Sequence, residues 1–206
     1  MSSGRPLSLI ALAAMALLGL APARGQDNAA GPAPLPVLTY LQGISGRYMV
    51  SGIHNREPNS RPDLQTNQMY TLVGRYPGIW SGDFLFEAEA IDSRWVMIYE
   101  CKNQWDHGAI VHLMMHVAPP NQNEDCGWEG GILSHLSDKE WTDLITDGGV
   151  LNKVWKSRLD DYATYLGYLR DNGVQVLFRP FHEMNQAQFW WGGRKGSKGT
   201  ARRNKP

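Results

Sequence analysis

Short apolar segments alternate with longer amphipathic segments along the middle of the chain. The short segments carry β-branched or aromatic side chains and are bounded by turn residues, so they are predicted strands: 48–53, 78–84, 109–117 and 174–178. The longer segments repeat apolar residues at three- and four-residue steps and are predicted helices: 64–76, 91–105 and 150–171. The last helix is expected to stop at Asn172-Gly173.

Strands and helices in this alternating order are typical of parallel βαβ units, so the sequence predicts an α/β fold. Residues 121–131, which follow the third strand, are polar and contain glycine, and they are a predicted loop. Ligands of parallel α/β folds bind at the carboxyl ends of the strands. The polar residues that follow each strand are therefore the first candidates for a functional site.

The two ends of the chain differ from its middle. One arginine precedes an apolar run over 7–20, and small residues follow, so 1–25 is a predicted signal peptide and the protein is expected to be secreted or periplasmic. The run is shorter than the about 20 residues of a membrane span, although an uncleaved anchor is the alternative. Residues 26–37 are rich in Ala, Pro and Gly and are a predicted linker, and 193–206 is a predicted flexible basic tail. No other segment is expected to meet a membrane.

The length and composition restrict the class of protein. A chain of 206 residues suits one domain, and 42% hydrophobic residues with eight tryptophans exclude wholesale disorder. The 20 basic and 20 acidic side chains balance, which argues against a nucleic-acid binder. Six of the basic residues gather in 192–206, so the body of the chain is acidic.

The sequence contains two cysteines, Cys101 and Cys126. Export to an oxidising compartment favours a disulfide between them, which would contribute roughly 3 kcal/mol by the loop-entropy argument. Two separate buried thiols are the alternative.

Ionisable residues follow all four predicted strands. His54, Asn55, Arg56 and Glu57 follow the first, Asp83 the second, His116 the third, and Arg179, His182 and Glu183 the fourth. Each residue alone is compatible with a structural polar group. Their recurrence at four successive strand ends predicts a site.

Glu183 is the strongest candidate in this set. Phe181 and Met184 flank it and Phe189-Trp190-Trp191 follow, so we expect a half-buried carboxyl whose pKa is raised, as a general acid requires. Sugar rings stack their CH faces on indoles, which makes the aromatic run a candidate sugar platform. Core packing is the alternative for these rings.

A metal site is considered because His112 and His116 have the i, i+4 spacing of a helical zinc pair. The segment that holds them is a predicted strand, on which i and i+4 lie about 13 Å apart and cannot share an ion. The sequence has no P-loop, no dinucleotide-binding glycine pattern and no G-x-S-x-G motif. We therefore predict neither a metal nor a cofactor.

Three motifs carry a resemblance to a known family. They are Ser51-Gly-Ile-His-Asn-Arg56, Met114-Met-His-Val-Ala-Pro119, and Phe178-Arg-Pro-Phe-His-Glu-Met-Asn185 with Phe189-Trp-Trp-Gly192. Over residues 38–192 the chain resembles glycoside hydrolase family 26, most of whose characterised members are endo-β-1,4-mannanases. The resemblance implies a (β/α)8 TIM barrel of which the first four βα units are present, a β-mannan or related β-linked polysaccharide as substrate, and a retaining mechanism with two glutamates.

The resemblance also assigns roles to individual residues. Glu183 corresponds to the acid/base, and His182 to the histidine that helps position the nucleophile and the sugar. Arg179 corresponds to the arginine that braces the site, and His116 to a substrate-contacting histidine. Trp190 and Trp191 correspond to the aromatic pair of the family motif, whereas Gln188 stands where relatives commonly have tryptophan.

The second glutamate of the family lies at the end of the seventh strand, and the four predicted strands do not supply it. We therefore expect a truncated family member in which the nucleophile is missing and which hydrolyses mannan weakly or not at all. A non-catalytic carbohydrate-binding remnant is the alternative. Assembly of two half-barrels is a third possibility, and the sequence does not determine the oligomeric state.

Overall fold

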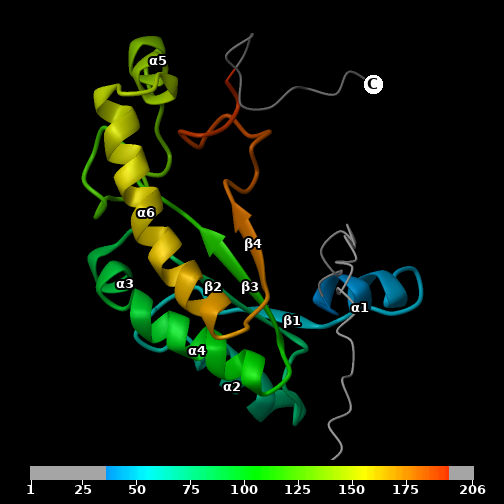
Figure 1. Ribbon diagram of the computed structural model, residues 1–206. Helices are drawn as coiled ribbons and strands as arrows, with labels where there is room; N and C mark the ends of the chain where they lie inside the picture. Colours follow the sequence, from blue (N-terminus) through cyan, green and yellow to red (C-terminus); the bar gives the residue numbers. More distant parts are fainter. Residues whose placement is uncertain (1–35, 195–206) are drawn as a thin grey trace, which may run out of the picture. The chain divides into compact units, whose positions relative to one another are not determined.

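A parallel four-stranded sheet lies at the centre of the chain in the computed structural model, which describes residues 36–194 (Figure 1). The strands follow one another in the order of the sequence: β1 (Gly52–His54), β2 (Ile79–Asp83), β3 (Ile110–Met115) and β4 (Val176–Pro180). Each pairs in parallel with the next. This sheet confirms the predicted parallel α/β class and the four predicted strands.

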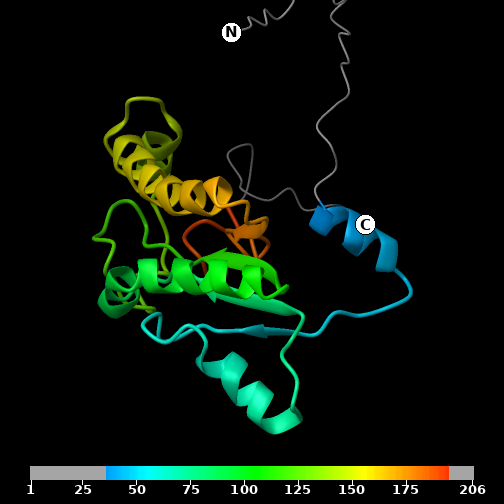
Figure 2. The same cartoon turned by 60° about the horizontal axis from the view of Figure 1, so that its bottom comes forward.

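Helices make the crossover between each pair of strands. The crossover helices are α2 (Leu64–Val73), α3 (Ala88–Asp92), α4 (Arg94–Asp106), α5 (Asp138–Ile145) and α6 (Val150–Asp171), whereas α1 (Pro36–Ile44) precedes β1. α2 joins β1 to β2, α3 and α4 join β2 to β3, and α5 and α6 join β3 to β4. α4 and α6 lie side by side along the sheet (Figures 1 and 2). The three βαβ crossovers, which contain all four strands, correspond to the predicted first half of a barrel.

Several element boundaries differ from those predicted. α1 begins at Pro36, inside the predicted linker, because proline suits the first position of a helix. The first strand starts four residues later than predicted, and Met49, which precedes it, is 98% exposed. The sequence analysis missed α5, although the capping box between Ser137 and Glu140 marks its start. The signal peptide and most of the basic tail lie outside the described residues.

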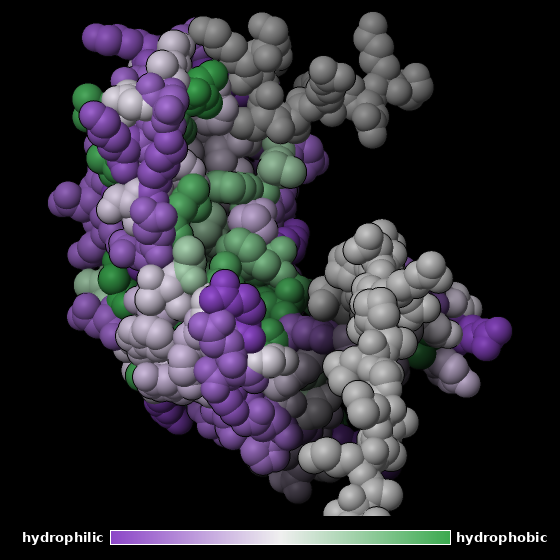
Figure 3. Space-filling view, in the orientation of Figure 1, coloured by the Kyte–Doolittle hydropathy of each residue, from purple (hydrophilic) through white to green (hydrophobic). Residues whose placement is uncertain are grey.

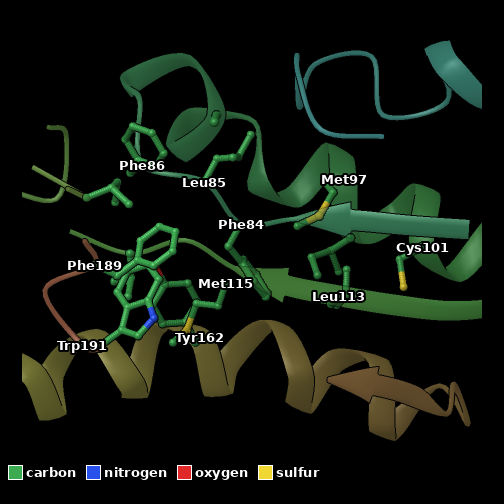
Figure 4. Close-up of a cluster of buried hydrophobic side chains, with 14 of the residues drawn as sticks. Phe84, Leu85, Phe86, Met97, Cys101, Leu113, Met115, Tyr162, Phe189 and Trp191 are labelled. Atoms are coloured by element: carbon green, nitrogen blue, oxygen red, sulfur yellow. The ribbon is translucent and has the colours of Figure 1, made fainter. Parts of the chain in front are cut away.

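One face of the sheet forms the core with α4 and α6. Trp80, Val111, Leu113 and Met115 alternate along β2 and β3, and each is at most 1% exposed. They belong to one cluster with buried side chains of α4 and α6, as the close-up shows (Figure 4). Apolar residues at every second position of the strands thus point to one side of the sheet, where they pack against the apolar faces of α4 and α6.

The opposite face carries a row of polar side chains. In the sheet register His54 lies beside Ser81, and Ser81 lies beside His112. The Ser81 hydroxyl lies 2.8 Å from Nδ1 of His54 and 2.7 Å from Nδ1 of His112. Burial lowers the pKa of both histidines, and the negative charge of Asp83 opposes this effect.

A buried arginine connects the helices to the end of β2. The side chain of Arg94 is 3% exposed, and it donates hydrogen bonds to the carbonyl oxygens of Phe84 and Leu85 and to the Tyr162 hydroxyl. It also forms an ion pair with Glu124 at 2.6 Å. Because Phe84 and Leu85 directly follow Asp83, this arginine holds the loop in which β2 ends.

The predicted disulfide between Cys101 and Cys126 is wrong in this structure, where both thiols are free. Cys101 lies at the opposite end of the labelled cluster from Phe86 (Figure 4), whereas the N–H of Cys126 donates a hydrogen bond to the Phe86 carbonyl. The two cysteines therefore lie at opposite ends of the core. Burial raises the pKa of Cys101 to about 12 and that of Cys126 to about 11, so both thiols stay protonated.

β4 is an edge strand of the described sheet. Hydrophobic residues gather over it and over the segment that follows (Figure 3). Phe178 in β4 is 38% exposed, and Met184 beyond it is 46% exposed. Within residues 36–194 no helix combines the length and the apolar run that crossing a bilayer requires.

Replacement of Arg94 tests the connection between helix and strand end. Arg94→Met would leave the carbonyl oxygens of Phe84 and Leu85 and the Glu124 carboxylate without this partner. We expect a loss of about 3–5 kcal/mol in the free energy of unfolding, measured by urea denaturation. The control Arg170→Met removes an exposed arginine that pairs with Asp171 and should leave the free energy of unfolding nearly unchanged. Equal losses in the two variants would contradict this role.

The lowered pKa values of His54 and His112 predict a pH-dependent stability. Below an ordinary pKa of 6.5 the unfolded chain binds protons that the folded chain excludes, so stability should fall as the pH falls from about 6.5 toward the lowered values. Above this range the two histidines should contribute no pH dependence. Urea denaturation at pH 7.5 and 5.5 measures the difference.

The variant His112→Gln should show a smaller loss between these two pH values than the natural chain. The control His107→Gln, at an exposed position after α4, should show the same loss as the natural chain. A natural chain of equal stability at both pH values would refute the prediction.

Candidate functional site

Polar side chains at the carboxyl ends of the four strands gather at one edge of the sheet. His54 ends β1, and Asp83 ends β2 opposite Met114 of β3. His116 and His182 follow β3 and β4 by one and two residues. The structure thus brings together candidates from strand ends that lie up to 128 positions apart in the sequence.

Asp83 is the most deeply buried member of this group, with no exposed surface. One of its oxygens, Oδ2, lies 2.6 Å from Nδ1 of His116 and 3.8 Å from Nε2 of His54. The other, Oδ1, accepts hydrogen bonds from the backbone N–H groups of His116 and Leu85. Burial by itself would raise the pKa of Asp83, but these contacts with His116 and Leu85 outweigh it and lower the pKa.

His116 and His182 lie against each other, with their ring centroids 4.2 Å apart. They are 7% and 8% exposed. Burial and the neighbouring His116 lower the pKa of His182, although the charge of Glu183 opposes them. Nδ1 of His182 has no hydrogen-bond partner among the described residues. A buried polar atom without a partner costs free energy, so this nitrogen is an unsatisfied group beside the pair of rings.

Glu183 is exposed, so the expectation of a half-buried carboxyl is wrong for the described residues. The reason is its place after the edge strand β4, where no described element covers the turn. Its φ of 53° is in the left-handed region, as are those of Phe181 and Leu85 at 51° and 52°. Non-glycine residues in this region are uncommon and gather at functional sites. All three lie in the loops that carry Asp83 and His182.

Arg179 lies in β4 and is exposed, with its Nη1 3.7 Å from Sδ of Met114. Its positive charge contributes to the lowered pKa values of His112 and His182. The guanidinium therefore lies within electrostatic range of the strand-end histidines. The structure is compatible with the expectation that it braces the site, which stays a prediction.

Trp190 and Trp191 lie in the core, which corrects the expectation of an open sugar platform. They are 4% and 3% exposed, and their indole N–H groups donate hydrogen bonds to the carbonyl oxygens of Val117 and His182. Trp191 stacks on Phe189, with the two ring centroids 4.6 Å apart. These rings therefore pack in the core, as the alternative interpretation predicted. Trp191 holds the backbone of His182 through the hydrogen bond to its carbonyl oxygen.

A cleft beside His116 exposes Trp128, an aromatic side chain that the sequence analysis did not select. The cleft has a volume of about 410 Å³, within the range of small-ligand sites, and is lined by Arg56, Glu57, Leu85, Phe86, Glu87, His116 and Trp128. Trp128 is 42% exposed, and its ring lies 5.8 Å from that of His116. A tryptophan within the polar loop 121–131 was the signal in the sequence that could have identified it. Larger hollows over α5 and over this loop lie away from the strand ends.

His112 in β3 and His116 directly after it contact protein side chains. His112 contacts Ser81, and His116 contacts Asp83. Within the part of the chain that the structure describes, no three His, Cys, Asp or Glu side chains meet in an arrangement that could hold an ion.

Comparison with known proteins identifies relatives of this chain. Mannan endo-1,4-beta-mannosidase A and B from Caldalkalibacillus mannanilyticus is 33% identical over 131 residues, which are 59% of this chain and 24% of the relative. A mannan endo-1,4-beta-mannosidase from Bacillus subtilis is 28% identical over 136 residues, which are 62% of this chain and 36% of the relative.

Solved structures share the fold. GH26A from Muricauda sp. superposes with a TM-score of 0.72 at 32% identity, over 79% of this chain and 52% of that one. A beta-mannanase from a symbiotic protist of the termite Reticulitermes speratus, solved with gluco-manno-oligosaccharide, gives a TM-score of 0.64 at 25% identity, over 76% of this chain and 50% of that one. This chain thus spans about half the length of these structures, which are (β/α)8 barrels.

A family model matches most of the chain. It covers residues 28–204 and reaches beyond the predicted barrel segment 38–192 at both ends. The parallel half-barrel and the strand-end cluster of His54, Asp83, His116 and His182 agree with this match. The chain belongs to glycosyl hydrolase family 26.

Proposed function

We propose that this chain carries the acid/base half of the active site of an exported enzyme that hydrolyses β-1,4-mannan within the polysaccharide. The observation that carries the proposal is the contact between His116 and His182 at the strand ends, beside a cleft that exposes Trp128. Glu183 directly follows His182 and acts on it electrostatically. Family membership supports hydrolysis of a glycosidic bond, and the names of the relatives support mannan as the substrate. Export is proposed from residues 1–25 alone.

In the proposed mechanism Glu183 donates a proton to the glycosidic oxygen as the bond breaks. As that bond breaks, a second carboxylate must attack the anomeric carbon and form the glycosyl-enzyme. Glu183 then removes a proton from the water that hydrolyses this ester and frees the carboxylate, so the anomeric configuration is retained. The exposed carboxyl does not have the apolar surroundings that a general acid requires at neutral pH. A bound sugar would cover Glu183 and exclude water from it during the proton transfer.

The cleft supports recognition of a sugar by two kinds of contact. The exposed face of Trp128 is suited to stack against the CH groups of a sugar ring. Arg56, Glu57 and His116 line the same cleft and offer hydrogen-bonding groups for sugar hydroxyls. We propose that these residues bind the part of the mannan chain that lies next to Glu183.

A retaining glycosidase also needs a second carboxylate, about 5–5.5 Å from the acid, as the nucleophile. By the family resemblance it belongs to a seventh strand, and the described residues form four. We therefore propose that this chain alone binds manno-oligosaccharides and releases little reducing sugar from mannan. A role in carbohydrate binding without catalysis is the second candidate, and the exposed Trp128 favours it.

Replacement of Trp128 tests the binding proposal. Trp128→Ala should weaken the binding of β-1,4-mannohexaose about tenfold by loss of a stacked ring, as measured by isothermal titration calorimetry. The control Trp95→Ala removes a 37%-exposed tryptophan of α4 and should leave the affinity unchanged. Binding that does not depend on Trp128 would contradict the proposed cleft, and a natural chain that does not bind would contradict the proposal as a whole.

A fusion with the rest of a family barrel tests the role of Glu183. We expect activity on mannan when this chain is joined to the part of Muricauda GH26A that it does not match. In that fusion Glu183→Gln should lower the rate of reducing-sugar release about 10²–10⁴-fold, because the general acid is lost. The control Glu100→Gln, on α4, should retain the rate. An active fusion that tolerates Glu183→Gln would refute the acid/base role.

A folded fusion that binds mannohexaose without hydrolysing mannan would favour the non-catalytic alternative. The natural chain, assayed in parallel without the fusion partner, should release little reducing sugar. Robust turnover by the natural chain would show that it supplies its own nucleophile and would overturn the proposal that it carries only half of the site.

A further inference from the structure

The two carboxylate oxygens of Asp83 have different kinds of partner. Oδ1 accepts two backbone hydrogen bonds, from the N–H of His116 at 3.1 Å and from the N–H of Leu85 at 3.2 Å. Oδ2 lies 2.6 Å from Nδ1 of His116, so it faces a side chain instead of the backbone. The backbone contacts therefore fix the orientation of the carboxylate, and one oxygen remains to act on the imidazole ring.

An ionised carboxylate can only accept hydrogen bonds. The proton in the short contact between Asp83 and His116 therefore belongs to Nδ1 of the histidine. In a neutral imidazole the other nitrogen, Nε2, then carries a lone pair and no proton. Because Nδ1 faces the buried Asp83 and His116 lines the cleft, the edge of the ring with Nε2 is the edge that a ligand can reach.

The same carboxylate determines the direction of a longer chain of hydrogen bonds. The Ser81 hydroxyl lies between Nδ1 of His54 and Nδ1 of His112, and because it has a single proton, only one of these nitrogens can accept from it. Nε2 of His54 lies 3.8 Å from Oδ2 of Asp83, and the negative charge favours a proton on this nitrogen. His54 then accepts from Ser81 at Nδ1, and His112 donates to Ser81.

We propose that Asp83 is a positioning residue that holds His116 in the Nδ1–H tautomer, so that His116 presents Nε2 to the cleft as a hydrogen-bond acceptor. The ligand group that matches it is a hydroxyl that donates its proton. For a sugar hydroxyl in the cleft the inference rests on the proposed function, whereas the tautomer itself does not.

The arrangement of the backbone contacts predicts what an amide at position 83 would do. In Asp83→Asn the carbonyl oxygen of the amide must occupy the place of Oδ1, because two backbone N–H groups point there. The NH₂ group then faces Nδ1 of His116 and donates to it. The histidine must change to the Nε2–H tautomer, and its exposed nitrogen becomes a donor instead of an acceptor.

The tautomers can be measured in the full chain without any ligand. Long-range ¹H–¹⁵N correlation spectra of ¹⁵N-histidine-labelled protein distinguish protonated from unprotonated ring nitrogens. We expect His116 as Nδ1–H in the natural chain and as Nε2–H in Asp83→Asn. The matched control Ser81→Ala removes the hydroxyl between His54 and His112 and should leave His116 as Nδ1–H.

The spectrum of the natural chain is a sufficient test if Asp83→Asn does not fold. His116 found as Nε2–H in the natural chain overturns the proposal. A folded Asp83→Asn variant that keeps His116 as Nδ1–H overturns it as well.

Titration with β-1,4-mannohexaose tests the consequence for binding. Asp83→Asn should bind about tenfold more weakly than the natural chain, because the sugar hydroxyl must then turn to accept from Nε2–H and gives up the hydrogen bond that it donated. Ser81→Ala should bind within about twofold of the natural chain. Equal affinity of natural chain and Asp83→Asn, with the tautomer changed, would refute the acceptor role of Nε2. A natural chain with the expected tautomer that does not bind would contradict the proposed function and leave the tautomer established.

Discussion

The buried carboxylate of Asp83 is the group on which the strand-end cluster depends. A charge without exposed surface is tolerated only when hydrogen bonds replace the water that it has lost. Here the backbone of Leu85 and the backbone and ring of His116 supply those bonds. They join the end of β2 to the segment that follows β3. Because His116 in turn packs against His182, the positions of the residues after β3 and β4 follow from one buried charge.

The loops that carry these residues are supported from the side of the helices. Arg94 reaches from α4 to the carbonyl oxygens that follow Asp83, and Trp191 donates to the carbonyl oxygen of His182. Both supports are themselves buried, so each lies in an environment where hydrogen bonds are strong. The cluster of histidines therefore rests on the same core that packs α4 and α6 against the sheet. Left-handed residues in the same loops indicate that the site is built at some cost in backbone energy.

The carboxyl groups of Asp83 and Glu183 differ in their surroundings. Asp83 lies inside the sheet and acts on neighbouring rings, whereas Glu183 follows an edge strand and meets solvent. In family 26 barrels of about twice this length, further strands continue the sheet beyond the matched half. Among the described residues no element covers the turn after β4, so the aromatic side chains near Glu183 in the sequence do not bury its carboxyl.

Periodicity in the sequence determined the strands, the long helix and the parallel order, because spacings of two and of three or four residues report directly which side chains face a core. The same pattern placed ionisable residues at all four strand ends, and the motif around His182 and Glu183 identified the family. Neighbours in the sequence did not predict the burial of individual side chains correctly. Phe189-Trp190-Trp191 fill the core, Glu183 is exposed, and Cys101 and Cys126 lie at opposite ends of that core. Only the tertiary structure decided these, along with the place of Trp128 in the cleft and the pairing of Asp83 with His116. Burial and contact depend on which segments pack together across the fold, and neighbours along the chain do not report that.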